Sequence, residues 1–570
     1  MNTQAPSTPR NGARWLTQAL EAEGVDTLFG YPGGTIMPFY DALVDSSLKH
    51  ILVRHEQGAA LAANGYARAS GRVGVCVATS GPGASNLVTG IADAMLDSVP
   101  MVCITGQVPT PLLGTDAFQE LDVFGMTLPI VKHSWLVRSV DELPAVVAAA
   151  FRIAREGRPG PVLIDMPKNV QLADASHLPA HVPASVPPVP APCPQQLEQA
   201  IAAIASAEKP VVYAGGGVGL GKAVDAFRQF VANSNIPTVL SLRGLGALTA
   251  NDPNYLGMLG MHGTYYANMA VTNSDLLISV GARFDDRVTG KIATFAPHAK
   301  IIHIDIDPTS IKKNVRVDLP IVGDLKDVLK KLVSKLAERK EEIPALVEAT
   351  EGWRQEINGW KTQHPMSYKA SKPIIKPQFV IEKLRELTQD DAIITTEVGQ
   401  HQMWTAQFFD FSQPRTFLSS GGLGTMGYGL PSALGAQAAF RERQVIDISG
   451  DGSFQMNSQE LATLVQYRLP VKIVILNNNF LGMVRQWQHL FFHNRYSQTC
   501  MELPIDFVKL AEAYGATGLQ ATKPDEVEDV IRKALDTPGP VIMEFKISRE
   551  ENVMPMVPAG AGLNEMVLAS

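Results

Sequence analysis

The sequence predicts an α/β protein with three doubly wound parallel-sheet domains. The chain has 570 residues, enough for three or four domains of ~150 residues each. Short runs rich in β-branched residues alternate with helical stretches along its whole length, which is typical of parallel sheets covered by helices. Apolar residues make up 45% of the chain and charged residues 18%, and this composition argues against disorder.

Two breaks in composition divide the chain into three blocks. Residues 178–194 contain seven prolines, so they can hold neither a helix nor a central strand and are expected to form an extended linker. Residues 341–376 are charged, partly helical and end in HPMSYKASKPIIK. We therefore expect an N-terminal domain at residues 1–177, a central domain at 195–340 and a C-terminal domain at 377–550, followed by a tail at 551–570.

Each block contains three short apolar runs that predict buried strands. They are residues 72–79, 100–105 and 161–166 in the first block, 210–215, 276–281 and 301–306 in the second, and 444–449, 471–476 and 540–545 in the third. The two longest uncharged stretches, residues 73–92 and 416–440, are too rich in Gly, Ser, Thr, Asn and Pro for membrane spans. We expect buried strands joined by tight loops there.

Charge and cysteine usage exclude several classes of protein. The formal net charge is −7 without a long run of either sign, which argues against a nucleic-acid partner. The four cysteines are scattered and form no C-x-x-C pair, so a disulfide scaffold and a cysteine-rich zinc site are excluded. The N-terminus lacks the apolar core of a signal peptide. A cytoplasmic protein without a membrane segment is expected.

The most informative motif lies in the third block. Gly450-Asp451-Gly452 follows one predicted strand, and Asn477-Asn478 follows the next after an intervening helical stretch. This crossover places Asp451 and Asn478 at the carboxyl ends of parallel strands, where open α/β sheets bind ligands. A carboxylate and an amide oxygen suit Mg²⁺, and the glycines let the backbone approach a phosphate. Because Gly-Asp-Gly alone is a common turn sequence, the prediction depends on the spacing.

Gly-Asp-Gly followed by twenty-four residues and Asn-Asn resembles the cofactor fingerprint of the thiamin diphosphate enzymes. The resemblance implies that Asp451, Asn478 and the backbone carbonyl of Phe480 bind Mg²⁺, which ties the cofactor diphosphate to the C-terminal domain. It also implies that Met426 supports the bent shape of the cofactor. The residues expected around thiamin diphosphate are Gly399, Gln400, His401, Met426, Gly452, Ser453 and Met483.

Glu56 is the expected catalytic residue. It follows the apolar run ILVRH and begins a helical stretch of small residues, in the context HEQGAA. The resemblance implies that its carboxylate binds the aminopyrimidine of the cofactor, held by the N-terminal domain, and faces Asp451 of a second subunit. A homodimer or a dimer of dimers is therefore expected. On local pattern alone, Glu56 could equally be a glutamate stabilised by the helix dipole.

The second block holds an imperfect nucleotide motif. Residues 216–222 nearly form a P-loop, but Ala223 stands where Ser or Thr would bind Mg²⁺, and Leu220 occupies the third glycine position of G-x-G-x-x-G. Three glycines still follow a predicted strand there. A nucleotide could lie against them, with Asp305 at a strand end placed to accept ribose hydroxyls.

The chain as a whole resembles the large catalytic subunits of the acetohydroxyacid synthases (acetolactate synthases). The matching motifs include YPGGTIMPFYDAL, TSGPGASN, RPGPVLIDMPK, MLGMHG, GARFDDRVTG and MVRQWQ. The resemblance implies two thiamin diphosphate-binding domains on either side of a central FAD-binding domain. The implied FAD contacts are Arg158, Gly215, Gly216, Gly260, Met261, His262, Gly281, Arg283, Asp285, Asp305 and Asp324.

The resemblance also implies the reaction. Pyruvate is decarboxylated on thiamin diphosphate, and the hydroxyethyl fragment condenses with pyruvate to give 2-acetolactate or with 2-ketobutyrate to give 2-aceto-2-hydroxybutyrate, the precursors of branched-chain amino acids. Arg287 would bind the acceptor carboxylate and Trp487 would favour 2-ketobutyrate, while Phe118, Gln119 and Lys168 would line the entry side. Taken alone, Trp487 could be plain core and Arg287 a surface or FAD ion pair. A separate small regulatory subunit is expected.

Several alternatives stay open at this point. A pyruvate oxidase, a simple decarboxylase or a catabolic, FAD-free acetolactate synthase would share most of the motifs, and product identity and flavin content distinguish them. A glyoxylate carboligase is disfavoured, because an apolar residue replaces the glutamate in that family. A non-catalytic nucleotide-binding module would leave the Gly-Asp-Gly and Asn-Asn pair unexplained.

Overall fold

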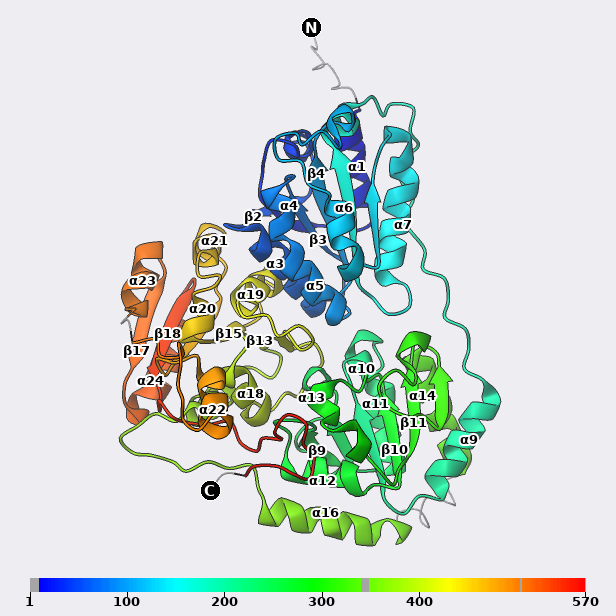
Figure 1. The fold of residues 1–570 in the computed structure, drawn as a ribbon, viewed down its shortest axis with the longest axis vertical. Helices are drawn as coiled ribbons and strands as arrows, with labels where there is room; N and C mark the ends of the chain where they lie inside the picture. The colour runs from blue at the N-terminus through cyan, green and yellow to red at the C-terminus, as the bar shows by residue number, and fades with distance from the viewer. Residues whose placement is uncertain (1–9, 340–347, 503–504, 569–570) are drawn as a thin grey trace.

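The computed structural model describes residues 10–339, 348–502 and 505–568. It contains three parallel six-stranded sheets, each flanked by helices (Figure 1), so the predicted fold class is confirmed. No helix of these residues is long and apolar enough to cross a membrane. The boundary expected between residues 340 and 341 lies outside the described residues, and the domain boundaries stay predictions.

The first sheet has the strand order β2-β1-β3-β4-β6-β5. Its strands are β1 (Thr27–Gly30), β2 (Lys49–Leu52), β3 (Gly74–Ala78), β4 (Met101–Gln107), β5 (His133–Leu136) and β6 (Pro161–Pro167). The helices are α1 (Gly12–Ala22), α2 (Met37–Leu43), α3 (Glu56–Ser70), α4 (Pro82–Asn86), α5 (Val88–Leu96), α6 (Val123–Thr127), α7 (Leu143–Arg155) and α8 (Lys168–Leu172).

The second sheet has the order β12-β11-β10-β7-β8-β9. Its strands are β7 (Pro210–Ala214), β8 (Thr238–Leu240), β9 (Tyr255–Met258), β10 (Leu276–Val280), β11 (Lys300–Asp305) and β12 (Leu319–Val322). The helices are α9 (Pro194–Ala205), α10 (Gly217–Leu220), α11 (Val224–Ser234), α12 (Tyr265–Asn273), α13 (Asp286–Thr289), α14 (Leu325–Glu338) and α16 (Glu351–Gln363). Between α8 and α9 the chain runs without helix or strand along the edge of the molecule (Figure 1).

The third sheet has the order β14-β13-β15-β16-β18-β17. Its strands are β13 (Ile393–Thr396), β14 (Phe417–Ser419), β15 (Val445–Gly450), β16 (Lys472–Asn477), β17 (Thr517–Ala521) and β18 (Val541–Lys546). The helices are α17 (Pro377–Leu387), α18 (Gln400–Phe408), α19 (Gly429–Ala439), α20 (Asp451–Phe454), α21 (Glu460–Gln466), α22 (Gly482–Phe491), α23 (Phe507–Tyr514) and α24 (Val527–Asp536). The C-terminal segment then returns to the central domain (Figure 1), where the Val557 N–H donates to the Met261 carbonyl at 2.8 Å.

All nine predicted strands are confirmed, each with bounds within two residues of the expected ones. The prediction of buried strands joined by tight loops at residues 73–92 and 416–440 is wrong in part: each stretch contains one strand, β3 or β14, but α4, α5 and α19 occupy much of the rest. Helix α19 contains no charged residue, and nearly all of it is buried. It therefore has no polar face toward solvent. A helix that is apolar all round lacks the pattern that distinguishes helix from strand in a sequence.

Helices α3 and α19 join the first domain to the third. They cross at Gly65 and Gly435, and a Cβ atom added at Gly435 would overlap the backbone carbonyl of Ala62, as one at Gly65 would overlap that of Ser432. The two glycines therefore let the helix backbones touch. Because cores pack to high density, there is no space nearby to absorb a larger side chain.

We expect Gly435→Ala to destabilise the folded chain by about 1–3 kcal/mol, because the added methyl forces α3 and α19 apart. Gly359→Ala is the matched control: Gly359 lies within α16, and nothing lies within 4 Å of its Cβ position. That substitution should stabilise the helix by about 0.5–1 kcal/mol. Calorimetric unfolding of the two variants beside the parent measures both effects. If Gly435→Ala and Gly359→Ala unfolded at the same temperature, the crossing of α3 and α19 would accommodate a methyl group and the prediction would be wrong.

Candidate functional site

The carboxyl edge of the third sheet gathers the residues of the Gly-Asp-Gly motif. Strands β15 and β16 pair in parallel, with Gly450 opposite Leu476, so Asp451 and Asn478 follow neighbouring strands as predicted. Both side chains are buried, at 4% and 5% exposure. They line a cavity of about 60 Å³. The other residues around it are Val398, Gly399, Gln400, His401, Trp404, Met426, Gly450, Gly452, Ser453, Leu476 and Phe480 to Val484.

The oxygen atoms at this edge suit a hard divalent cation. Burial raises the pKa of Asp451 to about 6 and outweighs the opposing charge of Lys546, which reflects the cost of burying a carboxylate. Asn478 accepts a hydrogen bond from the Phe480 N–H at 3.0 Å and donates its amide hydrogen to Gln400 at 3.2 Å. Its carbonyl oxygen thus stays on the side away from Gln400. A carboxylate, an amide oxygen and a backbone carbonyl are ligands that Mg²⁺ accepts.

Within the described residues there is no group of three or more His, Cys, Asp and Glu side chains that could hold a metal ion. A cation at this edge would therefore depend on one carboxylate supplemented by amide and backbone oxygens. Mg²⁺ suits such a site, because it usually keeps several waters and shares phosphate oxygens of a substrate or cofactor.

His401 fits an anionic ligand in the same cavity. Burial lowers its pKa to about 3, so the imidazole is neutral. Its Nε2 atom is buried and has no hydrogen-bond partner, a state that costs free energy unless a ligand satisfies it. Gly399 and Gly450 make room for the ring, since a Cβ at either would come within 3 Å of it. The first turn of α18, which begins at Gln400, adds free backbone N–H groups that favour a diphosphate.

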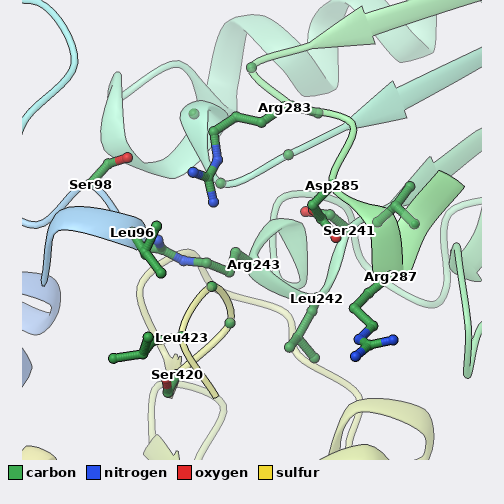
Figure 2. A pocket seen from close by; sticks show the side chains of 18 of the residues that line it. Leu96, Ser98, Ser241, Leu242, Arg243, Arg283, Asp285, Arg287, Ser420 and Leu423 are labelled. Atoms are coloured by element: carbon green, nitrogen blue, oxygen red, sulfur yellow. The ribbon is translucent and has the colours of Figure 1, made fainter. Parts of the chain in front are cut away.

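A larger cavity of about 940 Å³ lies where the three domains meet. Figure 2 shows Arg243, Arg283 and Arg287 of the central domain around it, together with Leu96 and Ser98 of the first domain and Ser420 and Leu423 of the third. Of the expected FAD residues, those that line it are Arg158, Gly215, Gly216, Met261, His262, Gly281, Arg283, Asp285, Asp305 and Asp324. Gly260 lies next to the wall without lining it. The structure thus brings almost the whole predicted set together.

The chemistry of the large cavity fits a dinucleotide. The end of β7 approaches the end of β10 so closely that a Cβ on Gly217 would lie 2.7 Å from the Cα of Gly281, which leaves bare backbone facing the cavity. The cavity is also lined by Arg158, Arg243 and Arg283, cations that suit a pyrophosphate. Burial lowers the pKa of the Arg243 guanidinium to about 10, so it stays charged at neutral pH. Arg243 is not among the residues predicted from the sequence, because it follows β8 in the run SLRGLG, which matches no binding motif.

The two cavities adjoin, because Val398, Gly399, Met426, Met483 and Val484 line both. Trp487 and Arg287 lie in the wall of the large one. The Arg287 guanidinium sits 6.0 Å from the centre of the Trp487 ring, and its side chain is 59% exposed. A cation and an aromatic wall thus stand where an acidic substrate could reach the smaller cavity.

Glu56 lies elsewhere and lines neither cavity. It begins α3, and its carboxylate accepts a hydrogen bond from Asn86 at 2.9 Å. A Cβ added at Gly83 would lie 3.1 Å from the Glu56 Oε1, and one added at Gly81 would lie 2.9 Å from the Gln119 carbonyl oxygen. Gln119 is therefore near Glu56. The neighbouring Phe118 side chain is 88% exposed. Lys168, at the start of α8, lines neither cavity. One chain therefore carries two separate halves of the expected site.

Three family models match the chain, one for each of its domains. The model of the thiamine pyrophosphate enzyme N-terminal TPP binding domain matches residues 10–126, that of the central domain matches 197–332, and that of the C-terminal TPP binding domain matches 397–545.

Curated relatives match along almost the whole chain. The acetolactate synthase isozyme 2 large subunit of Escherichia coli (strain K12) is 50% identical over 557 residues, which cover 98% of this chain and 99% of the relative. The acetolactate synthase large subunit of Parasynechococcus marenigrum (strain WH8102) is 50% identical over 577 residues, 100% of this chain and 92% of the relative. The isozyme 3 large subunit of Escherichia coli is 46% identical over 568 residues, 98% of each. The chain therefore belongs to the acetolactate synthase large subunits, within the thiamine pyrophosphate enzymes.

Proposed function

We propose that this chain decarboxylates pyruvate and joins the remaining two-carbon unit to a second 2-ketoacid. With pyruvate as acceptor the product is 2-acetolactate, and with 2-ketobutyrate it is 2-aceto-2-hydroxybutyrate, for branched-chain amino-acid biosynthesis in the cytoplasm. One observation carries the proposal: a small cavity with an oxygen donor set and an unsatisfied histidine opens into a larger one lined by Arg287 and Trp487.

The residues present fit thiamin diphosphate, Mg²⁺ and FAD. Asp451, Asn478 and the Phe480 carbonyl would hold the metal ion, while His401 and the first turn of α18 would receive the diphosphate. Thiamin diphosphate, when bound, supplies the electron sink that makes loss of CO₂ possible. FAD would occupy the 940 Å³ cavity, where it has a binding role, since the proposed reaction transfers no net electrons.

Arg287 and Trp487 would choose the acceptor. Arg287 offers a planar donor pair to the carboxylate of the second 2-ketoacid. Trp487 adds an apolar surface against which the extra methyl of 2-ketobutyrate can pack, while an exposed guanidinium beside it keeps the carboxylate end polar. Together they orient the substrate so that its keto carbon faces the smaller cavity.

We further propose that the site is completed by a second copy of the chain. The first domain, which carries Glu56, also exposes the apolar side chains of Leu112, Phe118 and Leu128. The third domain exposes Met456, Phe492 and Tyr496. Large exposed apolar patches mark interaction surfaces, and a two-fold dimer would bring Glu56 of one copy to Asp451 of the other. The assembly would be a homodimer or a dimer of dimers. The relatives are named large subunits, which supports a separate small regulatory subunit.

Product identity tests the reaction. Purified protein with thiamin diphosphate, Mg²⁺, FAD, pyruvate and 2-ketobutyrate should form both acetohydroxyacids, with 2-aceto-2-hydroxybutyrate in excess. Glu56→Gln should slow both products by about 10²–10⁴-fold, because a proton-transfer partner of the cofactor is lost, yet should keep the flavin absorbance of the parent. Acetaldehyde, acetate or acetyl phosphate as the main product would contradict the proposal.

Mixing two inactive variants tests the shared site. Glu56→Gln and Asp451→Asn chains, each inactive alone, should regain about one quarter of parental activity when dissociated and reassembled together, because half of the dimers then carry one intact site of two. The control is reassembly of each variant with itself. If Glu56 and Asp451 served the same site within one chain, the mixture would stay inactive.

Trp487→Leu tests acceptor choice. We expect the preference for 2-ketobutyrate over pyruvate to fall about 10–100-fold, since one methylene in an apolar pocket is worth that much discrimination, while the rate of 2-acetolactate formation from pyruvate alone is retained. Competition between the two ketoacids, with both products measured, gives the ratio. Phe491→Leu is the control: its ring lies 6.0 Å from that of Trp487 on the same helix and outside both cavities. An unchanged ratio in Trp487→Leu would exclude this residue as the selector.

A further inference from the structure

A row of buried amide side chains connects Asn478 with the C-terminal segment. The Asn478 Nδ2 donates to Gln400 Oε1 at 3.2 Å, and Gln400 Nε2 donates to Gln486 Oε1 at 2.9 Å. Gln486 in turn holds the backbone of Val553: its Oε1 accepts from the Val553 N–H at 2.8 Å, and its Nε2 donates to the Val553 carbonyl at 3.0 Å. The three side chains are at most 5% exposed, so water does not substitute for these bonds.

The orientation of the amide groups in this row is fixed at the Gln486 end. A side-chain amide can be turned over to exchange its oxygen and nitrogen, but a backbone N–H and carbonyl cannot. Because Val553 supplies both, Gln486 has one orientation, with its oxygen toward Gln400. Gln400 must then present its nitrogen to Gln486 and its oxygen to Asn478. A second bond from Gln400 Nε2 to the Glu551 carbonyl at 2.9 Å has the same polarity.

The consequence reaches the proposed metal ligand. Since Gln400 offers an oxygen, the Asn478 amide directs its nitrogen toward Gln400 and its oxygen toward the cavity. The Phe480 N–H, which donates to that oxygen at 3.0 Å, agrees with this orientation. Gly482 leaves the space in which the Asn478–Gln400 bond forms, because a Cβ there would overlap the Gln400 Oε1 and lie 2.9 Å from the Asn478 Nδ2.

We propose that Gln486 is a positioning residue for the metal site, which acts through Gln400 to keep the Asn478 oxygen directed at the cation. The inference rests on the proposed function, in which Asn478 binds Mg²⁺. Gln486 itself lines neither cavity and touches no reacting group. Partners that orient metal ligands in this way typically contribute 10–100-fold to metal affinity.

Direct metal binding tests the proposal independently of turnover. Mn²⁺ is titrated into the full-length protein, stripped of divalent ions and saturated with thiamin diphosphate, and free and bound Mn²⁺ are followed by electron paramagnetic resonance. Gln486→Met should weaken Mn²⁺ binding at least about tenfold and change the spectrum of the bound ion. Gly482→Ala should produce a similar loss, because the added methyl breaks the next bond of the row, between Asn478 and Gln400.

Gln488→Met is the matched control, on the same helix with the same change of side chain. The Gln488 side chain hydrogen-bonds to Ser497 and Thr499, outside the row, so the variant should bind Mn²⁺ as the parent does. Asn478→Asp provides a rescue: a carboxylate has two equivalent oxygens and needs no orientation. In the Asn478→Asp background, Gln486→Met should weaken Mn²⁺ binding less than about threefold. A double-variant cycle measures this coupling between the two positions.

The outcomes separate the two proposals. If the parent protein binds no Mn²⁺ in the presence of thiamin diphosphate, the proposed metal site is wrong. If the parent binds Mn²⁺ and Gln486→Met binds it equally well, the positioning role is overturned while the metal site stands. A loss of the same size with Asp at position 478 would also overturn it, because the effect would then come from general destabilisation of α22 and not from the orientation of Asn478.

Discussion

The parallel pairing of β15 with β16 is the constraint on which the candidate site depends. Parallel strands end at the same edge of a sheet, so the residues after β15 and after β16 must meet there. This brings Asp451 beside Asn478 although a helix and a strand separate them in sequence. Pairing of β13 with β15 adds the third member, because α18 and His401 follow β13. Backbone hydrogen bonding thus sets the positions of all three groups.

The larger cavity depends on a second constraint, a buried ionic junction of the three domains. Asp97 of the first domain is ion-paired with Arg68 at 3.4 Å and with Arg243 of the central domain at 3.2 Å. It also accepts hydrogen bonds from the backbone N–H groups of Gly421 and Gly422 in the third domain. Burial alone would raise the pKa of Asp97, but the two arginines and these donors outweigh it and lower the pKa. A buried charge so fully paired specifies how the domains meet, because loss of any partner would leave the others unsatisfied.

Much of the fold and of the site followed from the sequence, because the signals were local. Nine strands were recognisable as short apolar runs, and the spacing between Asp451 and Asn478 was enough to place both at one sheet edge. Helix α19 was mistaken for strand because its surroundings, not its own pattern, make it a helix: it is buried against α3, which lies more than 350 residues away in sequence.

Long-range contacts also explain the residues that sequence reasoning missed. Gln486 meets Val553 across 67 positions, and Arg243 meets Asp97 across 146. Gln486 lies in the run MVRQWQ and Arg243 in SLRGLG, but nothing in either run indicates the distant residue that the side chain contacts. Only the assembled domains show that Arg243 borders a cavity and that Gln486 links the C-terminal segment to Gln400. The roles assigned to individual residues stay predictions, although the structure brings most of them together.

The separation of Glu56 from Asp451 follows from the same geometry. Each lies at the edge of its own sheet, and the contact between α3 and α19 fixes the two domains so that Glu56 lines neither cavity. Glu56 is partly exposed, and a carboxylate open to solvent is a poor partner for chemistry that must exclude water. The apolar side chain of Phe118, in the same domain, is also almost fully exposed. A second copy would bury that surface and bring a dry cavity to the carboxylate. Association and completion of the site would then be one event, so an isolated chain would fold without being active.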